Sequence, residues 1–511
     1  MSRSDFKTAA EDFKQAVKMR PETAELWANL GLMQHESGDY AEAIRSFQQA
    51  IRFKSSLYVP NLFLGIDYLH TGNSTAAIQF LAKAERMNKT DPEAPLELGR
   101  AYSSAGDFPA AAREFTRAIQ LDPKQSDAWL GRGMAYLDHV EEDARKLSTE
   151  GRNSSYAEAL YAESMARQSR YIEATDSFKK AIAAQPQPPC LHAEFGLMYL
   201  SQKKIEDAES EFKAEPQANP GCGITDLGEA RLHVEQGTNP AARHGQCAAT
   251  PAENLSRRSE SELLQLSACA YFSGDYALAS SASDALSARP ARSLGGLYWS
   301  IKADEMLALQ SLEHFEQLAP NSAPSHILLG DMYRQRHRYD EAQAQYKLAL
   351  EISPADHGAL LGLAYAYYGN ANIDATIATA SSALAASPSD PELNLLMGEA
   401  LIARHDFAGA EPFLQKGLAA KPQMLPHVHA MLGTVYAETG RTQDAIAQLE
   451  MGLAADQDGS TYYKLARMYR KSGDTKRADA AMQQVKVMEQ QRRKGAVIAL
   501  EDSGQRAEGD R

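Results

Sequence analysis

The sequence predicts an all-α protein, a solenoid of stacked helix-turn-helix units, and three observations lead to this prediction. First, small residues recur every 34 positions in the N-terminal part, at Gly31, Gly65, Gly99 and Gly133. Second, prolines recur at the same interval further along, at Pro320, Pro354, Pro388 and Pro422. Third, apolar residues within each unit follow helical spacing. Because one amphipathic helical hairpin cannot bury its apolar face alone, we expect neighbouring units to stack into a continuous core.

The unit from residue 323 to residue 356 shows the pattern clearly. Its first helix carries Leu329 and Tyr333 on one face, and its second helix places four residues on one face: Ala342, Tyr346, Ala349 and Leu350. Gly330 is small where the two helices should approach most closely, because a larger side chain there would force the backbones apart. Pro354 is expected to end the second helix, since proline removes a hydrogen-bond donor.

The chain is predicted to begin with half a unit. Residues 1–20 have the pattern of a second helix only, with the expected residue types at Ala9, Phe13, Ala16 and Pro21. Residues 21–237 should then form an N-terminal array. The turns between its paired helices carry glycine followed by Asp or Asn, at Gly38-Asp39, Gly72-Asn73 and Gly106-Asp107. Glycine tolerates the positive φ of such a turn, and Asp or Asn can cap the helix that follows.

Two stretches interrupt the periodicity. Residues 138–155, DHVEEDARKLSTEGRNSS, are strongly charged, and we expect an irregular unit there. Residues 238–259 have poor helical periodicity and contain turn-forming Pro, Gly and Asn, which predicts an irregular linker and a domain boundary. A C-terminal array is expected over residues 260–492, and a disordered tail over residues 493–511.

The repeated unit resembles the tetratricopeptide repeat (TPR). The resemblance is carried by an L-G-x2-Y frame and the positions that follow it: Leu329, Gly330, Tyr333, Ala342, Tyr346, Ala349 and Pro354. Trp27 and Trp129 occupy the tryptophan position of the motif in two N-terminal units. The resemblance covers the chain from about Asp5 to Arg492. It implies a right-handed α-solenoid with a concave groove lined by first helices, and a role in protein-protein assembly.

The charge balance narrows the class of partner. The chain has 53 Lys and Arg against 67 Asp and Glu, a net charge of −14, which disfavours nucleic acid or an anionic membrane as the main partner. No apolar run approaches the roughly 18 to 20 residues needed to span a bilayer, so no membrane insertion is expected. As it stands, the chain is expected in the cytoplasm. A missing upstream signal peptide would instead make it periplasmic or secreted.

The four cysteines, at positions 190, 222, 247 and 269, form no C-x-x-C pair, so the usual zinc and thioredoxin-like spacings are absent. Cys190 and Cys222 should lie near the starts of first helices in adjacent units. In an exported protein they could form a disulfide, although neighbouring helices are usually about 8 to 10 Å apart and a disulfide needs Cα atoms within about 7 Å. The alternative is two buried or partly exposed thiols.

No common phosphate-binding, dinucleotide, zinc-protease or hydrolase signature occurs. We therefore predict that the chain is not an enzyme and carries no cofactor. His427 and His429 lie two positions apart and have no carboxylate at ligand spacing, so structural or solvated rings are expected rather than a metal site. Two functions are considered. One is a non-enzymatic scaffold or adaptor that binds other proteins or extended peptide segments. The other is a regulatory or assembly subunit of an envelope or polysaccharide-processing enzyme complex.

The concave groove of the C-terminal array is the predicted binding surface. From the register, four side chains should point away from the second helices: Arg334, Tyr365, Tyr368 and Glu399. Two tyrosines beside an arginine and a glutamate offer apolar contact area and charge-assisted hydrogen bonds, a composition typical of interface hot spots. The alternative is that these side chains only pack against neighbouring first helices and stabilise the superhelix.

Overall fold

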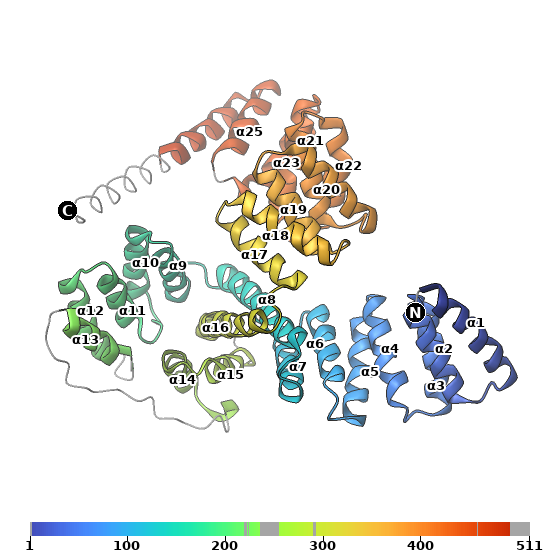
Figure 1. Cartoon of the computed structure of the whole chain (residues 1–511). Helices are drawn as coiled ribbons and strands as arrows, with labels where there is room; N and C mark the ends of the chain where they lie inside the picture. Colours follow the sequence, from blue (N-terminus) through green and yellow to red (C-terminus); the bar gives the residue numbers. More distant parts are fainter. Residues whose placement is uncertain are drawn as a thin grey trace. The chain divides into compact units, whose positions relative to one another are not determined.

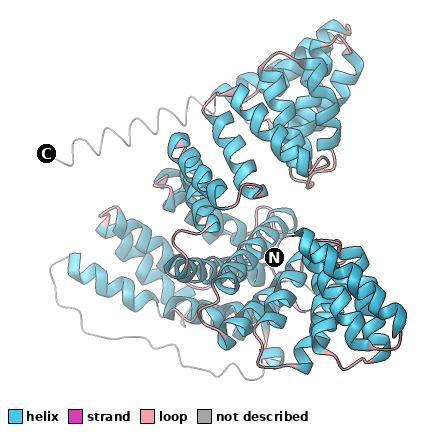
Figure 2. Cartoon of the chain, turned by 45° about the vertical axis from the view of Figure 1, so that its right-hand side comes forward, coloured by secondary structure: helices cyan, strands magenta, loops and turns pink. Residues whose placement is uncertain are grey.

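The computed structural model describes residues 3–218, 222, 224–235, 255–289, 293–456 and 458–490. In these ranges the regular structure is helical, with helices joined by short loops (Figure 2). The predicted all-α fold class is confirmed. The chain divides into two compact units, residues 1–318 and residues 319–511, which we call unit 1 and unit 2. None of the described helices is both long and apolar enough to cross a membrane.

Unit 1 contains helices of two lengths, most of 11 to 17 residues and two of 25 residues. The helices are α1 (Arg3–Met19), α2 (Ala24–Ser37), α3 (Tyr40–Phe53), α4 (Tyr58–His70), α5 (Ser74–Met87), α6 (Glu93–Ala105), α7 (Phe108–Leu121), α8 (Ser126–Glu150), α9 (Ser155–Arg167), α10 (Tyr171–Ala183), α11 (Leu191–Ser201), α12 (Ile205–Ala218), α13 (Ile224–Glu235), η1 (Leu255–Arg257), α14 (Glu260–Ser273), α15 (Tyr276–Ser287) and α16 (Leu294–Leu318).

Unit 2 is more uniform, and its helices α17 to α25 have 11 to 14 residues. They are α17 (Ala323–Gln335), α18 (Tyr339–Ile352), α19 (His357–Gly369), α20 (Ile373–Ala386), α21 (Pro391–Ala403), α22 (Phe407–Gly417), α23 (Leu425–Glu438), α24 (Thr442–Gly452), η2 (Leu453–Ala455) and α25 (Ser460–Lys471). The described part of the chain is helical again from residue 475 to residue 490.

The tight turns predicted between paired helices are present. Gly106 ends α6 with a φ of 78°, a left-handed conformation that L side chains rarely adopt. Asp107 follows it, and its side chain accepts a hydrogen bond from the backbone N–H of Ala110 at 3.1 Å, which caps α7. The Gly72-Asn73 turn repeats this arrangement before α5, whereas at Gly38-Asp39 the glycine turn is present and the Asp39 side chain makes no cap. The glycine and cap positions therefore account for the sharp reversal between helices.

An aromatic side chain of the second helix lies between two glycines in several units. A Cβ at residue 330 would lie 2.6 Å from Cε1 of Tyr346, and Gly362 in the next first helix is as close to the same ring. Phe115 sits in the same way between Gly99 and Gly131. The first helices can approach only because they lack side chains at these points. Gly330 was predicted as such a position, whereas Gly362 was not.

Unit 1 departs from a simple linear array at α8 and α16. These helices lie side by side (Figure 1), although residues 151–293 separate them in the sequence. The ring of Trp129 stacks on His314 with centroids 4.3 Å apart. Arg132 Nε donates to Ser311 Oγ at 3.0 Å. The helix α16 therefore packs beside α8 and not only beside helices that are near it in the sequence.

The charged residues 138–155, expected to form an irregular unit, mostly extend α8. No Gly or Pro interrupts residues 138–150, and Lys146 pairs within the helix with Glu142 at 2.8 Å and Asp143 at 3.0 Å. In α16, Ala303-Asp304 occupies the place that Gly-Asp holds in regular units, so the helix continues instead of turning.

The expected linker and tail lie largely beyond the described residues. Of residues 238–259, the structure describes 255–259, which include η1. The expected disordered tail, residues 493–511, is outside the described ranges.

Cys190 and Cys222 form a disulfide, with Cα atoms 5.3 Å apart. The spacing expected between neighbouring helices does not apply, because Cys190 caps α11 in a left-handed conformation and Cys222 precedes α13. Both residues therefore lie outside the helical segments, where the backbones approach more closely than two packed helices can. Glu215 lies close to both sulfurs. Since the sulfurs are bonded to each other, they do not provide the thiolates that a metal would need.

Candidate functional site

The first helices of unit 2, α17, α19, α21, α23 and α25, form one layer in which each helix contacts the next. We call the surface of this layer the first-helix face. It is defined by residues from successive helices: Asp331, Arg334, Tyr365, Tyr368, Glu392, Glu399, His427, Thr434, Lys464 and Arg467. The four residues predicted for the groove are among those that define the face, and their role in binding stays a prediction.

Arg334 and Tyr365 are joined across α17 and α19. The Arg334 guanidinium pairs with Asp331 at 3.1 Å and donates through Nε to the hydroxyl of Tyr346 at 3.3 Å. Its Cζ lies 5.6 Å from the centroid of the Tyr365 ring. This is the geometry of a cation–π contact. The Tyr365 ring therefore already serves as a platform for one cation.

Two carboxylates lie beside the tyrosines. Tyr365 donates its hydroxyl proton to Glu392 Oε1 at 3.3 Å. Burial, with the charges of Glu392 and Glu399, raises the pKa of Tyr365 well above its usual range. Burial and the charge of Glu399 raise the pKa of Tyr368 to about 12. The structure thus brings both tyrosines and Glu399 together, and both phenols stay protonated at neutral pH.

His427 has a carboxylate partner that the sequence reasoning did not foresee. Its Nε2 hydrogen-bonds Glu399 on the preceding first helix, and this bond, with the nearby negative charge, raises the pKa of His427. The expectation of no carboxylate partner considered only residues close in sequence, whereas Glu399 lies 28 positions away. His429 instead contacts Gln448 at 2.7 Å. The two histidines therefore point to different neighbours.

The sequence did not lead us to predict Glu392 and Lys464 as residues of this face. Glu392 lies seven positions before Glu399, two helical turns along α21, so the same register that selected Glu399 could have found it. Lys464 on α25 donates to Thr434 Oγ1 at 3.0 Å, and burial lowers its pKa. No carboxylate within salt-bridge distance of Lys464 is found among the described residues.

The two tyrosines also contribute to packing. Tyr365 and Tyr368 are partly buried against the apolar core of unit 2, which includes Leu395, Leu396 and Leu401. Neither ring is fully buried. Each therefore stabilises the layer and keeps part of its surface accessible, so packing and binding are compatible roles for the same side chains.

Unit 1 contains a buried charge cluster that belongs to no predicted site. Lys302 on α16 is 4% exposed, and its Nζ lies 2.6 Å from Glu194 on α11 and 2.9 Å from Glu163 on α9. Tyr298 donates to Glu163 at 2.5 Å. Four aromatic rings surround the ammonium, at 4.9 to 5.6 Å from their centroids. Because every partner comes from the protein itself, the cluster is satisfied and joins α16 to α9 and α11.

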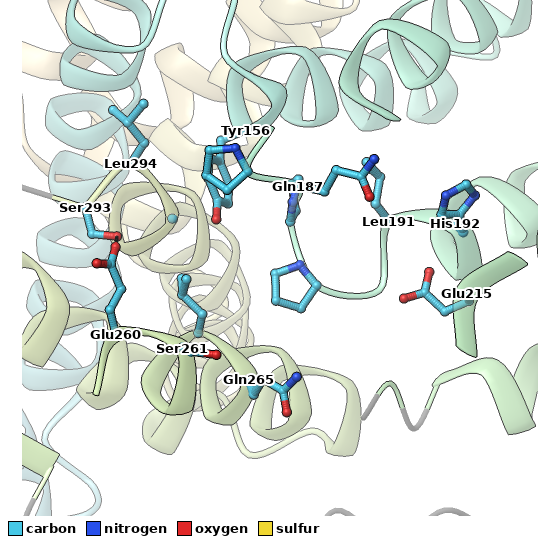
Figure 3. Close-up of a pocket in the computed structure, with 15 residues that line it drawn as sticks. Tyr156, Gln187, Leu191, His192, Glu215, Glu260, Ser261, Gln265, Ser293 and Leu294 are labelled. Carbon is cyan, nitrogen blue, oxygen red and sulfur yellow. Dashed lines mark hydrogen bonds between the residues drawn. The ribbon is translucent and has the colours of Figure 1, made fainter. Parts of the chain in front are cut away.

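A pocket also lies in unit 1, between the start of α11 and the helices α14 and α16 (Figure 3). Its volume is about 630 Å³. Pro188, Leu264 and Leu294 give it apolar walls, and Glu215 and Glu260 add carboxylates. None of the four predicted groove residues lines it.

The helical hairpins, the glycines between first helices and the two-layer packing define an α-solenoid of repeated units. Models of the tetratricopeptide repeat match residues 1–57 and 96–144, residues 369–433 and 401–469, and residues 461–495. A model described as TPR repeat matches residues 330–370. The chain belongs to the tetratricopeptide repeat family. Repeats of this family typically act as protein-interaction scaffolds without catalytic activity.

Several solved structures are similar to the chain. A crystal structure of MamA is 23% identical over 35% of this chain and 88% of MamA, with a TM-score of 0.26. YrrB, described as a TPR protein with an unusual peptide-binding site, is 17% identical over 44% of this chain and 99% of its own, with a TM-score of 0.23. A human IFIT1 dimer with PPP-AAAA is 15% identical over 93% of both chains, with a TM-score of 0.35. No curated protein matches the chain.

Proposed function

We propose that the chain is a non-enzymatic scaffold or adaptor that binds an extended segment of another protein on the first-helix face of unit 2. The observation that carries the proposal is the pair of partly accessible tyrosines, Tyr365 and Tyr368, between Arg334 and the two glutamates of α21. Rigid aromatic side chains beside charged groups provide contact area and directed hydrogen bonds at little entropic cost.

A double substitution, Tyr365→Ala with Tyr368→Ala, tests the proposal. The protein is used as bait in an extract of the source organism, and recovered proteins are quantified beside the thermal melt. We expect the variant to remain folded and to lose the proteins that the wild type recovers. Leu348→Ala with Ile352→Ala is the matched control, because both residues are exposed on the second helix α18.

Unchanged recovery by a folded tyrosine variant would contradict the proposed site and direct attention to the N-terminal array. An enzyme recovered in fixed ratio would support the alternative function, a regulatory or assembly subunit of an envelope or polysaccharide-processing complex.

We propose further that the protein works in an oxidising compartment, the periplasm or the exterior, rather than in the cytoplasm. The disulfide between Cys190 and Cys222 supports this placement, because cytosolic thiols are kept reduced. Protein isolated from the source cells in the presence of an alkylating reagent should contain no alkylated Cys190 or Cys222 by mass spectrometry. Quantitative alkylation of both residues would overturn this proposal.

A further inference from the structure

We infer that the segment bound on the first-helix face carries a basic side chain, Arg or Lys, that docks beside Tyr365 and Tyr368 against Glu392 and Glu399. This inference rests on the proposed function and adds the chemistry of the partner. Its basis is the order of charges along the face and the groups that already surround the two tyrosines.

The charge along the face is unevenly distributed among its helices. On α17, Arg334 is neutralised by Asp331. On α21, Glu392 and Glu399 give two negative charges with no Lys or Arg in salt-bridge contact among the described residues. On α25, Arg467 is paired with Glu438 at 3.8 Å, and Lys464 is the basic group of the face with no carboxylate in salt-bridge contact among the described residues. The negative region is therefore confined to the part of the face formed by α19 and α21, which fits one cationic group.

The side chains in this region suit a cation in three ways. The Tyr365 ring holds the Arg334 guanidinium on one side, which shows that a cation fits against this ring. Among the described residues, the one side-chain hydrogen bond to the Glu392 carboxylate is the long 3.3 Å bond from Tyr365. Glu399, whose side chain is 12% exposed, is paired with His427, and this pairing raises the pKa of the imidazole. An incoming guanidinium or ammonium would therefore find one carboxylate, Glu392, without a cationic partner among the described residues, and a second, Glu399, whose partner is a titratable imidazole.

The opposite partner, an acidic segment like the carboxylate that some TPR domains clamp, fits this part of the face poorly. A carboxylate placed beside Glu392 and Glu399 would be repelled by both. Among the described residues of the face, Lys464 on α25 is a basic group with no carboxylate in salt-bridge contact, and its charge acts on His427 rather than on Glu392. A basic residue over α19 and α21 therefore satisfies the charge pattern where an acidic one does not.

A library of random 12-residue peptides displayed on phage, selected on the full-length chain, tests the inference. We expect the enriched peptides to share a basic residue at one position. Replacing that residue by Gln should weaken binding to the wild-type protein about tenfold, since a hydrogen-bonded charge contributes on this scale. The same replacement should change binding to the Glu392→Gln/Glu399→Gln variant by less than about twofold, because the two changes share one interaction.

The matched control is Glu351→Gln with Asp374→Asn, which removes two negative charges from exposed positions of the second helices α18 and α20. It should retain the tenfold preference for the basic peptide. If replacing the basic residue by Gln weakens binding equally to the wild type and to the Glu392→Gln/Glu399→Gln variant, the inference is overturned. The proposed function stays in place in that case if Tyr365→Ala with Tyr368→Ala still abolishes peptide binding. If no peptide is enriched, or if the tyrosine variant binds the peptides as well as the wild type does, both the inference and the proposed function are overturned.

Discussion

In unit 2, the helices α17 to α25 pack against helices that are near them in the sequence, whereas in unit 1 the helices α8 and α16 pack against each other across 143 intervening residues, 151 to 293. The first arrangement needs only local contacts, and its stability should be close to a sum over neighbouring units. The second depends on contacts that form only when distant parts of the chain meet. Unit 1 should therefore lose its structure as one cooperative body, and unit 2 more gradually.

The two regions also bury different chemistry. Among the described residues of unit 2, the buried polar side chains are uncharged, as at Ser325, Thr376 and Asn394. Unit 1 adds buried charge: the Lys302 cluster, and Asp304, which is 1% exposed and accepts hydrogen bonds from His139 at 2.6 Å and from Ser280 at 2.7 Å. Buried polar groups favour one arrangement over others only when every partner is in place. They therefore make the long-range closure of unit 1 specific and sensitive to single changes.

The substitution Lys302→Met should show the largest effect. It leaves Glu163 and Glu194 buried without their cation, and removing one partner of a buried ion pair costs about 3 to 5 kcal/mol. All three tryptophans, Trp27, Trp129 and Trp299, lie in unit 1, so urea unfolding followed by tryptophan fluorescence reports this unit. The midpoint of that transition should fall sharply.

A triple variant provides the control for Lys302. Combining Lys302→Met with Glu163→Gln and Glu194→Gln removes the unpaired charges and should recover much of the lost stability. If Lys302→Met alone leaves the fluorescence midpoint unchanged, the cluster does not hold α16 to α9 and α11, and the contrast between the two units loses its main support.

The substitution Gly330→Leu should have a smaller effect that is confined to unit 2. Its side chain would overlap the Tyr346 ring, and overpacking of this kind costs about 1 to 3 kcal/mol. Thermal unfolding followed by circular dichroism should show the loss, while tryptophan fluorescence should not. Met332→Leu, an exposed position on the same helix, is the control. A melt of the Gly330→Leu protein equal to that of the wild type would remove the packing argument.

The smallest expected effect is a dependence of unit 1 stability on pH. Burial, with the charge of Asp304, raises the pKa of Asp284 to about 6. Because the folded state holds this proton more tightly than the unfolded state, the stabilisation is complete at low pH and is lost as the pH rises through about 6. Between pH 5 and pH 8 the loss should be about 1 kcal/mol.

The pH effect is measured as the fluorescence midpoint in urea at a series of pH values. Asp284→Asn should flatten the curve, because the amide does not titrate. Circular dichroism of unit 2 serves as the internal comparison. An unaltered slope in the Asp284→Asn protein would show that this carboxyl is not the responsible group.

Much of the fold follows from local pattern, and the long-range features do not. The hairpin turns could be predicted because glycine with positive φ and an Asp or Asn cap act within a few residues, as at Gly106 and Asp107. Gly330 could be predicted from its phase in the repeat. The pairing of α8 with α16 could not be predicted, since the periodicity of neither helix identifies its packing partner. The absence of a Gly-Asp turn at Ala303-Asp304 was visible in the sequence, but the sequence did not show that the longer helix would pack against α8.

The residues of the candidate site likewise fall into those that could be predicted from the sequence and those that could not. Register within a helix was enough to select Arg334, Tyr365, Tyr368 and Glu399. The partners Glu392 and His427 depend on how far one helix is shifted along the next, which the repeat length alone does not give. Contacts between successive units, such as His427 with Glu399, therefore require the structure.

The Tyr346 ring, held between Gly330 and Gly362, also has an evolutionary consequence. A residue change at any one of these three positions alters the space available to the other two. Substitutions in adjacent repeats should therefore be correlated. If one of these repeats were exchanged or duplicated alone, an aromatic ring could lose its second glycine, or a glycine could lose the ring that packs against it. We expect insertions and deletions of repeats here to have boundaries that keep each aromatic residue together with both of its glycines.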